Sequence, residues 1–142
     1  MDPESIHQKL AELWNARKIH EIAALAGPDY TYTGADGHER PGIQAGLDVA
    51  KLFAAAFPDA TLTVDRVHVA GNVAIAEMTG RGTHGGDLMG IAPTHRAITI
   101  KICNVIELRD GKIHREREYS DMPSILSQLG VSSIPTHAAS AQ

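Results

Sequence analysis

The sequence has 142 residues, of which 43% are hydrophobic and 21% are charged, a composition typical of one soluble globular domain. Lysine and arginine number 13 against 17 acidic residues, and the net charge of −4 argues against a dedicated nucleic-acid-binding protein. The single cysteine, Cys103, excludes an internal disulfide and a cysteine-based zinc site. The apolar stretches are too short to span a membrane and the acidic start lacks a signal-peptide pattern, so we expect a cytoplasmic protein.

Helical patterns dominate the first part of the chain. Asp2-Pro3 is typical of a helix start, and apolar residues follow at helical spacing at positions 6, 10, 13 and 14. A second helical stretch covers residues 19–25 and ends at Gly27-Pro28. Strand-forming residues then occupy 30–33, and after a polar turn a third helix is predicted over 43–57.

Strand patterns dominate the rest of the chain. After a strand that begins near Leu62, we expect strands over 73–84 and 96–108, and Asp110-Gly111 predicts a hairpin to a partner strand over 112–120. A short helix follows over 123–129. This order favours an α+β fold with an antiparallel sheet. We expect one domain over residues 1–130 and a frayed tail over 131–142.

Asn104 interrupts an apolar face in the clearest strand. Ile98, Ile100, Ile102 and Ile106 alternate with outward residues on that face, whereas Cys103 lies on the opposite one. A buried amide without a partner costs about 1–3 kcal/mol, so Asn104 either orients a substrate carbonyl or bonds a neighbouring side chain or water.

Six segments together resemble the SnoaL-like polyketide cyclases of the nuclear transport factor 2-like superfamily. They span residues 10–130 and are Leu13-Trp14-Asn15-Ala16, Ala54–Asp59, Arg81–Gly85, Gly90–Thr94, Asp110–Ile113 and Tyr119–Asp121. The resemblance implies a cone-shaped α+β barrel, with a curved mixed or antiparallel sheet wrapped around the helices and a central pocket. It also implies chemistry without a metal or cofactor.

The resemblance assigns the acid–base role to Asp121, in an intramolecular aldol closure of a polycyclic or aromatic carbonyl substrate. A carboxyl at the mouth of an apolar pocket is poorly solvated, which raises its pKa and suits it to acid–base work. The alternative is that Asp121 caps the helix that starts at Pro123.

Arg117 departs from the tryptophan that this family often carries. Simple alternation from Ile113 puts Arg115, Arg117, Tyr119 and Asp121 on one face, where Arg117 would pair with Asp121 and lower its pKa. Such a pair resembles the water-activating cluster of limonene epoxide hydrolases. The second carboxylate would then be Glu77, Asp65 or Glu107.

A hydrolase, an isomerase or a hydroxylase-type relative is therefore an alternative function. In a purely structural alternative, Arg115 and Arg117 extend into solvent at a sheet edge or pair with Glu116 and Glu118 on neighbouring chains.

The eight histidines are dispersed without metal-site spacing, so we expect no metal. His84 is a candidate proton carrier at the pocket rim, or alternatively a residue that bonds the loop backbone. The loop over 86–93 is expected to cover the pocket entrance or to form a dimer contact. The candidate substrate-binding residues are Trp14, Tyr32, Phe53, Met78, Met89, Ile91, Arg117 and Tyr119.

A homodimer, or a tetramer built from it, is expected from the same resemblance, with a small-molecule substrate and no nucleic-acid or membrane partner. The contact would use the strand over 96–108 and its hairpin, with rim charges at Lys101, Glu107, Arg115 and Glu118. The third functional alternative is a non-catalytic module that binds a small molecule or dimerises, because a fold alone does not define a function.

Overall fold

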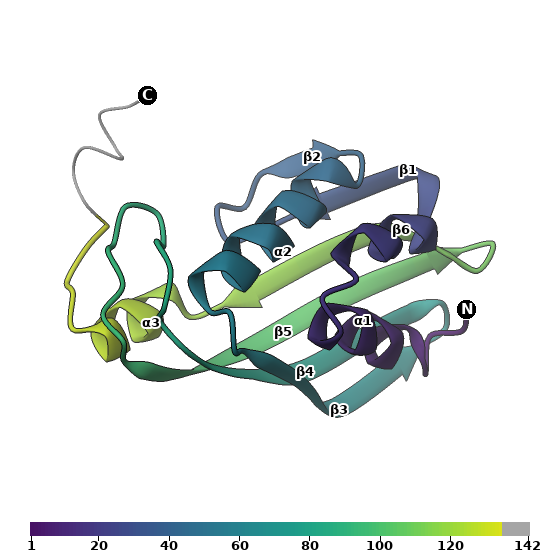
Figure 1. Cartoon of the computed structure of the whole chain (residues 1–142). Helices are drawn as coiled ribbons and strands as arrows, with labels where there is room; N and C mark the ends of the chain where they lie inside the picture. Colours follow the sequence, from purple (N-terminus) through teal and green to yellow (C-terminus); the bar gives the residue numbers. More distant parts are fainter. Residues whose placement is uncertain (135–142) are drawn as a thin grey trace.

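The computed structural model describes residues 1–134 and contains a curved, open, six-stranded sheet with helices over one face (Figure 1). The elements in chain order are α1 (Ile6–Asn15), the 3₁₀ helix η1 (Ile19–Leu25), β1 (Ala26–Thr33), β2 (Glu39–Pro41), α2 (Gln44–Ala56), β3 (Thr61–Ala70), β4 (Val73–Thr83), β5 (Ala97–Arg109), β6 (Lys112–Ser120) and α3 (Met122–Leu129).

The sheet is mixed, with strand order β2-β1-β6-β5-β4-β3. β1 and β6 run parallel, and every other neighbouring pair is antiparallel. Helices α1 and α2 lie over the concave face, and α3 follows β6 at the end of the sheet (Figure 1). The expected α+β cone is thereby confirmed.

Two local elements differ from the sequence prediction. β1 begins at Ala26 and runs through Gly27-Pro28, the pair expected only to end a helix, and Pro28 is exposed there. β2 was not anticipated, because it is a three-residue edge strand with every residue exposed and no apolar pattern. The predicted hairpin turn is present, with positive φ at both Asp110 (53°) and Gly111 (75°), as a type I′ turn requires.

A β-bulge at His114 changes which side chains of β6 face inward. Leu108 pairs with Ile113 and Glu107 pairs with Arg115, so β6 carries one extra residue between these pairs. Beyond the bulge the alternation is reversed relative to Ile113. Residues directly opposite one another share a face, and Glu118 lies opposite the inward-facing Asn104.

Two apolar clusters hold the helices to the sheet. One, beneath α1, contains Ile6, Tyr30, Tyr32, Ala74, Ile106, Leu108 and Ile113. The other, between the end of α2 and α3, contains Ala56, Phe57, Leu88, Ile91, Ile98, Ile125 and Leu129. The space between helices and sheet that these clusters leave unfilled becomes the candidate site.

The C-terminal segment has no helix or strand over residues 131–134. The rest of the tail expected to fray, residues 135–142, lies outside the described residues. Within residues 1–134, no helix is long and apolar enough to cross a membrane.

Candidate active site

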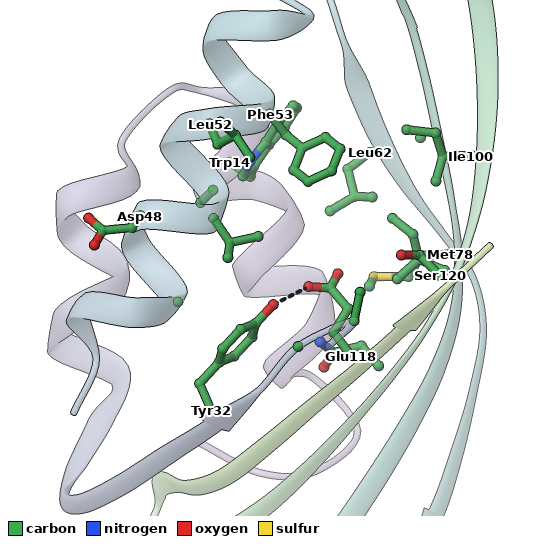
Figure 2. Close-up of a pocket in the computed structure, with 18 of the residues that line it drawn as sticks. Trp14, Tyr32, Asp48, Leu52, Phe53, Leu62, Met78, Ile100, Glu118 and Ser120 are labelled. Atoms are coloured by element: carbon green, nitrogen blue, oxygen red, sulfur yellow. Dashed lines mark hydrogen bonds between the residues drawn. The ribbon is translucent and has the colours of Figure 1, made fainter. Parts of the chain in front are cut away.

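A cavity of about 730 Å³ lies between the helices and the concave face of the sheet. This volume is in the range that holds a drug-sized ligand. Its wall is largely apolar, with Leu52 and Phe53 from α2 facing Leu62, Met78 and Ile100 from the sheet (Figure 2). Such a wall suits a hydrophobic ligand.

Glu118 places a carboxyl inside this apolar cavity. The Tyr32 hydroxyl donates to Glu118 Oε2 at 2.9 Å, and Figure 2 shows the carboxyl among the side chains that line the cavity. Burial, reinforced by the charge of Glu116, raises the pKa of Glu118 to about 7, although the Tyr32 hydrogen bond acts in the opposite direction. Glu118 therefore has the environment of a general acid–base group at neutral pH.

Glu116 lies next to Glu118 on the same face and accepts two side-chain hydrogen bonds, whereas Glu118 accepts one. Tyr30 OH donates to Glu116 Oε1 at 2.7 Å, and Asn104 Nδ2 donates to Oε2 at 2.9 Å. Burial raises the pKa of Glu116, and both hydrogen bonds oppose that rise. Asn104 Oδ1 lies 2.9 Å from Nε2 of the fully buried His7. Asn104 thus satisfies its polar atoms through neighbouring side chains, one of the two outcomes expected for it.

Six of the residues proposed from the sequence line the cavity. They are Trp14, Tyr32, Phe53, Met78, Met89 and Asn104. They come from α1, β1, α2, β4, the loop before β5, and β5 itself, and the fold brings them together around one space. Their contact with a substrate remains a prediction.

Asp121 does not line this cavity, contrary to the expectation that it lies at the pocket mouth. It is the exposed N-cap of α3, and its Oδ1 accepts a hydrogen bond from the backbone N–H of Ser124 at 3.1 Å. It borders a separate, shallow depression that also includes Cys103 and Lys101. The helix-capping alternative describes its geometry.

Arg117 and Tyr119 also lie away from the cavity, because the bulge at His114 reverses the alternation assumed for β6. Arg117 Nη1 pairs with Glu107 Oε2 at 2.5 Å, not with Asp121. Tyr119 is 57% exposed. Conversely, Glu118 was expected among the rim charges of an interface and instead faces inward. The proposed Arg117–Asp121 pair is therefore wrong.

His84 and Ile91 are core residues of the loop before β5. His84 is fully buried, its Nδ1 accepts from the Thr94 backbone N–H at 3.1 Å, and its ring lies 5.5 Å from that of Phe57. Ile91 packs in the second apolar cluster and does not line the cavity. Only Met89 of this loop reaches the cavity wall. The loop-bonding alternative for His84 matches the geometry.

The sequence reasoning did not identify Glu118, Glu116, Tyr30 and His7 as site residues. A usable signal was present: two tyrosines at 30 and 32 and two glutamates at 116 and 118 both repeat at the strand period of two. β1 and β6 are neighbours in the sheet, so the two pairs meet. In the described part of the chain, no three histidine, cysteine, aspartate or glutamate side chains gather as a metal site.

Comparison with known sequences agrees with this architecture. The sequence profile of the SnoaL-like polyketide cyclases matches residues 4–129. The chain belongs to this family. A curated relative, the aklanonic acid methyl ester cyclase AcmA of Streptomyces galilaeus, is 26% identical over 129 residues, which cover 87% of each chain.

Solved structures show the same fold. IdmH from Streptomyces antibioticus, a proposed polyketide cyclase, is 28% identical with a TM-score of 0.81, over 92% of this SnoaL-like chain and 100% of IdmH. AclR from Streptomyces galilaeus, a proposed hydroxylase, is 21% identical with a TM-score of 0.83, over 98% of this chain and 88% of AclR. At that identity the AclR match concerns the fold alone.

Proposed function

We propose that this protein is a cofactor-independent cyclase that closes a ring by an intramolecular aldol reaction on a polycyclic, polyketide-type carbonyl substrate. The observation that carries the proposal is the Glu118 carboxyl in a largely apolar cavity, with its pKa raised to about 7. Membership of the SnoaL-like family and the similarity to AcmA support the same reaction class.

Glu118 would act first as a base and then as an acid. Its carboxylate removes a proton from a carbon activated by neighbouring carbonyls, which leaves an enolate and a neutral carboxyl. The enolate carbon then bonds to a second carbonyl carbon of the same molecule. The oxygen of that carbonyl becomes an alkoxide and takes the proton back from Glu118, so the product is an isomer of the substrate and the enzyme returns to its starting state.

Tyr32 holds the Glu118 carboxyl in place through this cycle. Burial and the nearby charge of Glu118 raise the pKa of the Tyr32 hydroxyl, so the hydroxyl remains a donor throughout the neutral range. Its hydrogen bond occupies Glu118 Oε2 and leaves Oε1 for the substrate. The apolar wall excludes water, which would otherwise compete for the enolate.

The first experiment compares Glu118→Gln with Asp121→Asn on the substrate for which AcmA is named, aklanonic acid methyl ester. We expect Glu118→Gln to lose about 10²–10⁴-fold in kcat/KM, because the acid–base group is removed. Asp121→Asn should keep turnover within a few-fold, because asparagine also caps helices and Asp121 lies outside the cavity. Product is followed by chromatography, and reversible enolate formation is followed by deuterium exchange from D₂O into the activated carbon of unreacted substrate.

A folded Glu118→Gln variant with the wild-type rate would exclude the acid–base role of Glu118. A folded but inactive Asp121→Asn variant would return that role to Asp121. Binding of the ester without ring closure or deuterium uptake by the wild-type protein would indicate a non-catalytic binding module instead.

A further inference from the structure

A chain of hydrogen bonds runs from α1 through β5 and ends on Glu116. An ionised carboxylate only accepts, so Asn104 must present its Nδ2 donor to Glu116 Oε2 and its Oδ1 acceptor to His7. Nε2 of His7 is then the donor of the 2.9 Å contact. Tyr30 OH donates to the other oxygen of Glu116 at 2.7 Å. Both oxygens of Glu116 therefore receive a hydrogen bond from a buried donor.

Glu118, two residues further along β6, has one donor. Tyr32 OH bonds its Oε2, and no hydrogen bond to Oε1 is found in residues 1–134. Two residues on one face of a strand are about 7 Å apart, close enough for one buried charge to influence the other. The two carboxyls are thus adjacent but unequal in the number of donors that stabilise their charged forms.

The surroundings of the pair contain little positive charge within the described cavity wall. The titratable and charged side chains that face this space or pack against it are Tyr30, Tyr32, Asp36, Arg40, Asp48, Arg81 and His7. Arg40 is engaged by Asp36 at 2.6 Å, and Arg81 and Asp48 are exposed. Burial lowers the pKa of His7, which keeps its ring neutral. A charge on Glu116 is therefore not cancelled by a nearby buried cation.

We propose that Glu116 is a positioning residue for the acid–base chemistry of Glu118: the donors from Tyr30 and from the His7–Asn104 chain fix a carboxylate charge at Glu116, and that charge favours the protonated form of the neighbouring Glu118 carboxyl. The inference rests on the proposed function of Glu118. Like charges that share a buried site cannot both ionise easily, and the carboxyl with more donors ionises first.

The charge on Glu116 has a consequence for the rate. The negative charge of Glu116 raises the pKa of Glu118, in addition to the larger effect of burial. A carboxylate with a higher pKa is a stronger base, and one that titrates near the working pH can also return the proton. Without the charge at Glu116, Glu118 would ionise at lower pH and remove a carbon-bound proton less readily.

The test is a titration of Glu118 in the ligand-free protein by NMR, with ¹³C-labelled glutamate carboxyls and with Glu118 assigned by its absence in Glu118→Gln. In Glu116→Gln, which preserves size and removes the charge but replaces one accepting oxygen by a donating NH₂ group, we expect the pKa of Glu118 to fall by about one pH unit or more. The acid limb of the kcat/KM profile should move down by the same amount. Glu77→Gln is the matched control, because Glu77 bonds His68 on the exposed face of the sheet.

Tyr30→Phe is the second variant and covers the case in which Glu116→Gln fails to fold. It removes one donor but no carboxyl, so Glu116 should hold its charge less well and the titrations of Glu116 and Glu118 should move closer together. A Glu118 titration that is unchanged or moves upward in folded Glu116→Gln overturns the inference, and so do titrations of Glu116 and Glu118 that do not approach one another in folded Tyr30→Phe. A role confined to stability would lower the unfolding midpoint without moving that titration.

The two proposals can fail separately. The titration needs no substrate, so a downward movement of the Glu118 pKa in Glu116→Gln supports the coupling whatever the activity assay gives. If Glu118→Gln remains active while that movement is observed, the coupling stands and the proposed function fails. If Glu118→Gln is inactive and the Glu118 titration does not respond to Glu116, the proposed function stands and the inference fails.

Discussion

Asp121 joins the last strand to the last helix, and its carboxylate accepts a hydrogen bond from the backbone N–H of Ser124. Its position before Pro123 favours a cap, whereas the family resemblance favours an acid–base group. The two roles differ in what they require of the residue, since a cap requires only a side-chain oxygen and catalysis requires a titrating carboxyl.

Replacing Asp121 with alanine should therefore lower stability and leave activity intact. Loss of an N-cap costs about 1 kcal/mol of unfolding free energy, and asparagine at this position should restore nearly all of it. Urea denaturation of Asp121→Ala and Asp121→Asn measures the difference, with kcat/KM measured on the same samples. An alanine variant as stable as the wild type, but inactive, would contradict the capping role.

Two glutamates on opposite faces of the sheet show how environment divides one residue type into two roles. Glu107 accepts a hydrogen bond from Arg117 on the outer face, and this contact lowers the pKa of Glu107. Within residues 1–134, Glu118 has no cation beside it and it lies in the cavity, so burial raises its pKa to about 7. The role of a glutamate in this sheet therefore cannot be predicted from its residue type alone, because the role depends on the face on which the side chain lies.

At the level of the element, the bulge in β6 decides that face. Counting in steps of two from Ile113 predicts Arg117 and Tyr119 inside, and the extra residue at His114 puts Glu116 and Glu118 inside instead. A one-residue shift of register moves every following side chain to the other face. The site therefore depends on an irregularity of the backbone as well as on residue types.

Deleting His114 should leave Glu116 and Glu118 on the inner face, because it removes the extra residue of the bulge. Ile113 opposite Leu108 and Arg115 opposite Glu107 then become consecutive pairs of a regular ladder, so the alternation from Ile113 stays in phase with the core. Soluble yield and thermal unfolding followed by circular dichroism test whether this variant folds. His114→Ala is the matched control, because it retains the bulge and should unfold near the wild-type temperature. A deletion variant that does not fold would show that the local bend at the bulge is itself required.

Much of the architecture was predictable from the sequence, because periodicity and turn residues report local structure directly. The Asp110-Gly111 hairpin, the inward Asn104 and the apolar wall around Phe53 all follow from such local signals. The inward direction of Glu116 and Glu118 could not be predicted in this way, because a bulge depends on pairing with another strand and leaves no local pattern. Nor could the full burial of His84, because that burial depends on contact with Phe57, a distant residue in the chain.

Over the whole molecule, the sheet separates charged and apolar environments. The outer face carries partnered charges in contact with solvent, such as Glu107–Arg117 and His68–Glu77. The inner face carries two carboxyls whose only hydrogen-bond donors in the described structure are neutral, Tyr30, Tyr32 and Asn104. Burying ionisable groups in this way costs stability, as is common where a site is organised for chemistry.

This cost makes the stability of the protein depend on pH in a defined window. The pKa of Glu118 is about 7 in the folded protein against an ordinary value of 4.5, so the folded state holds this proton more tightly than the unfolded chain does. The stabilisation from the bound proton is complete below about pH 4.5 and is lost as the pH rises to about 7. Its full size is roughly 3 kcal/mol.

Glu118→Gln removes this titration. We therefore expect the difference in unfolding free energy, variant minus wild type, to grow between pH 4.5 and pH 7 by up to roughly 3 kcal/mol. His7 acts with the opposite sign, because burial lowers its pKa and its protonation favours the unfolded chain at acid pH. Both proteins contain His7, so its contribution cancels in the difference. Urea denaturation at half-unit pH intervals measures the difference, and a constant value across the window would mean that Glu118 titrates as an ordinary exposed glutamate.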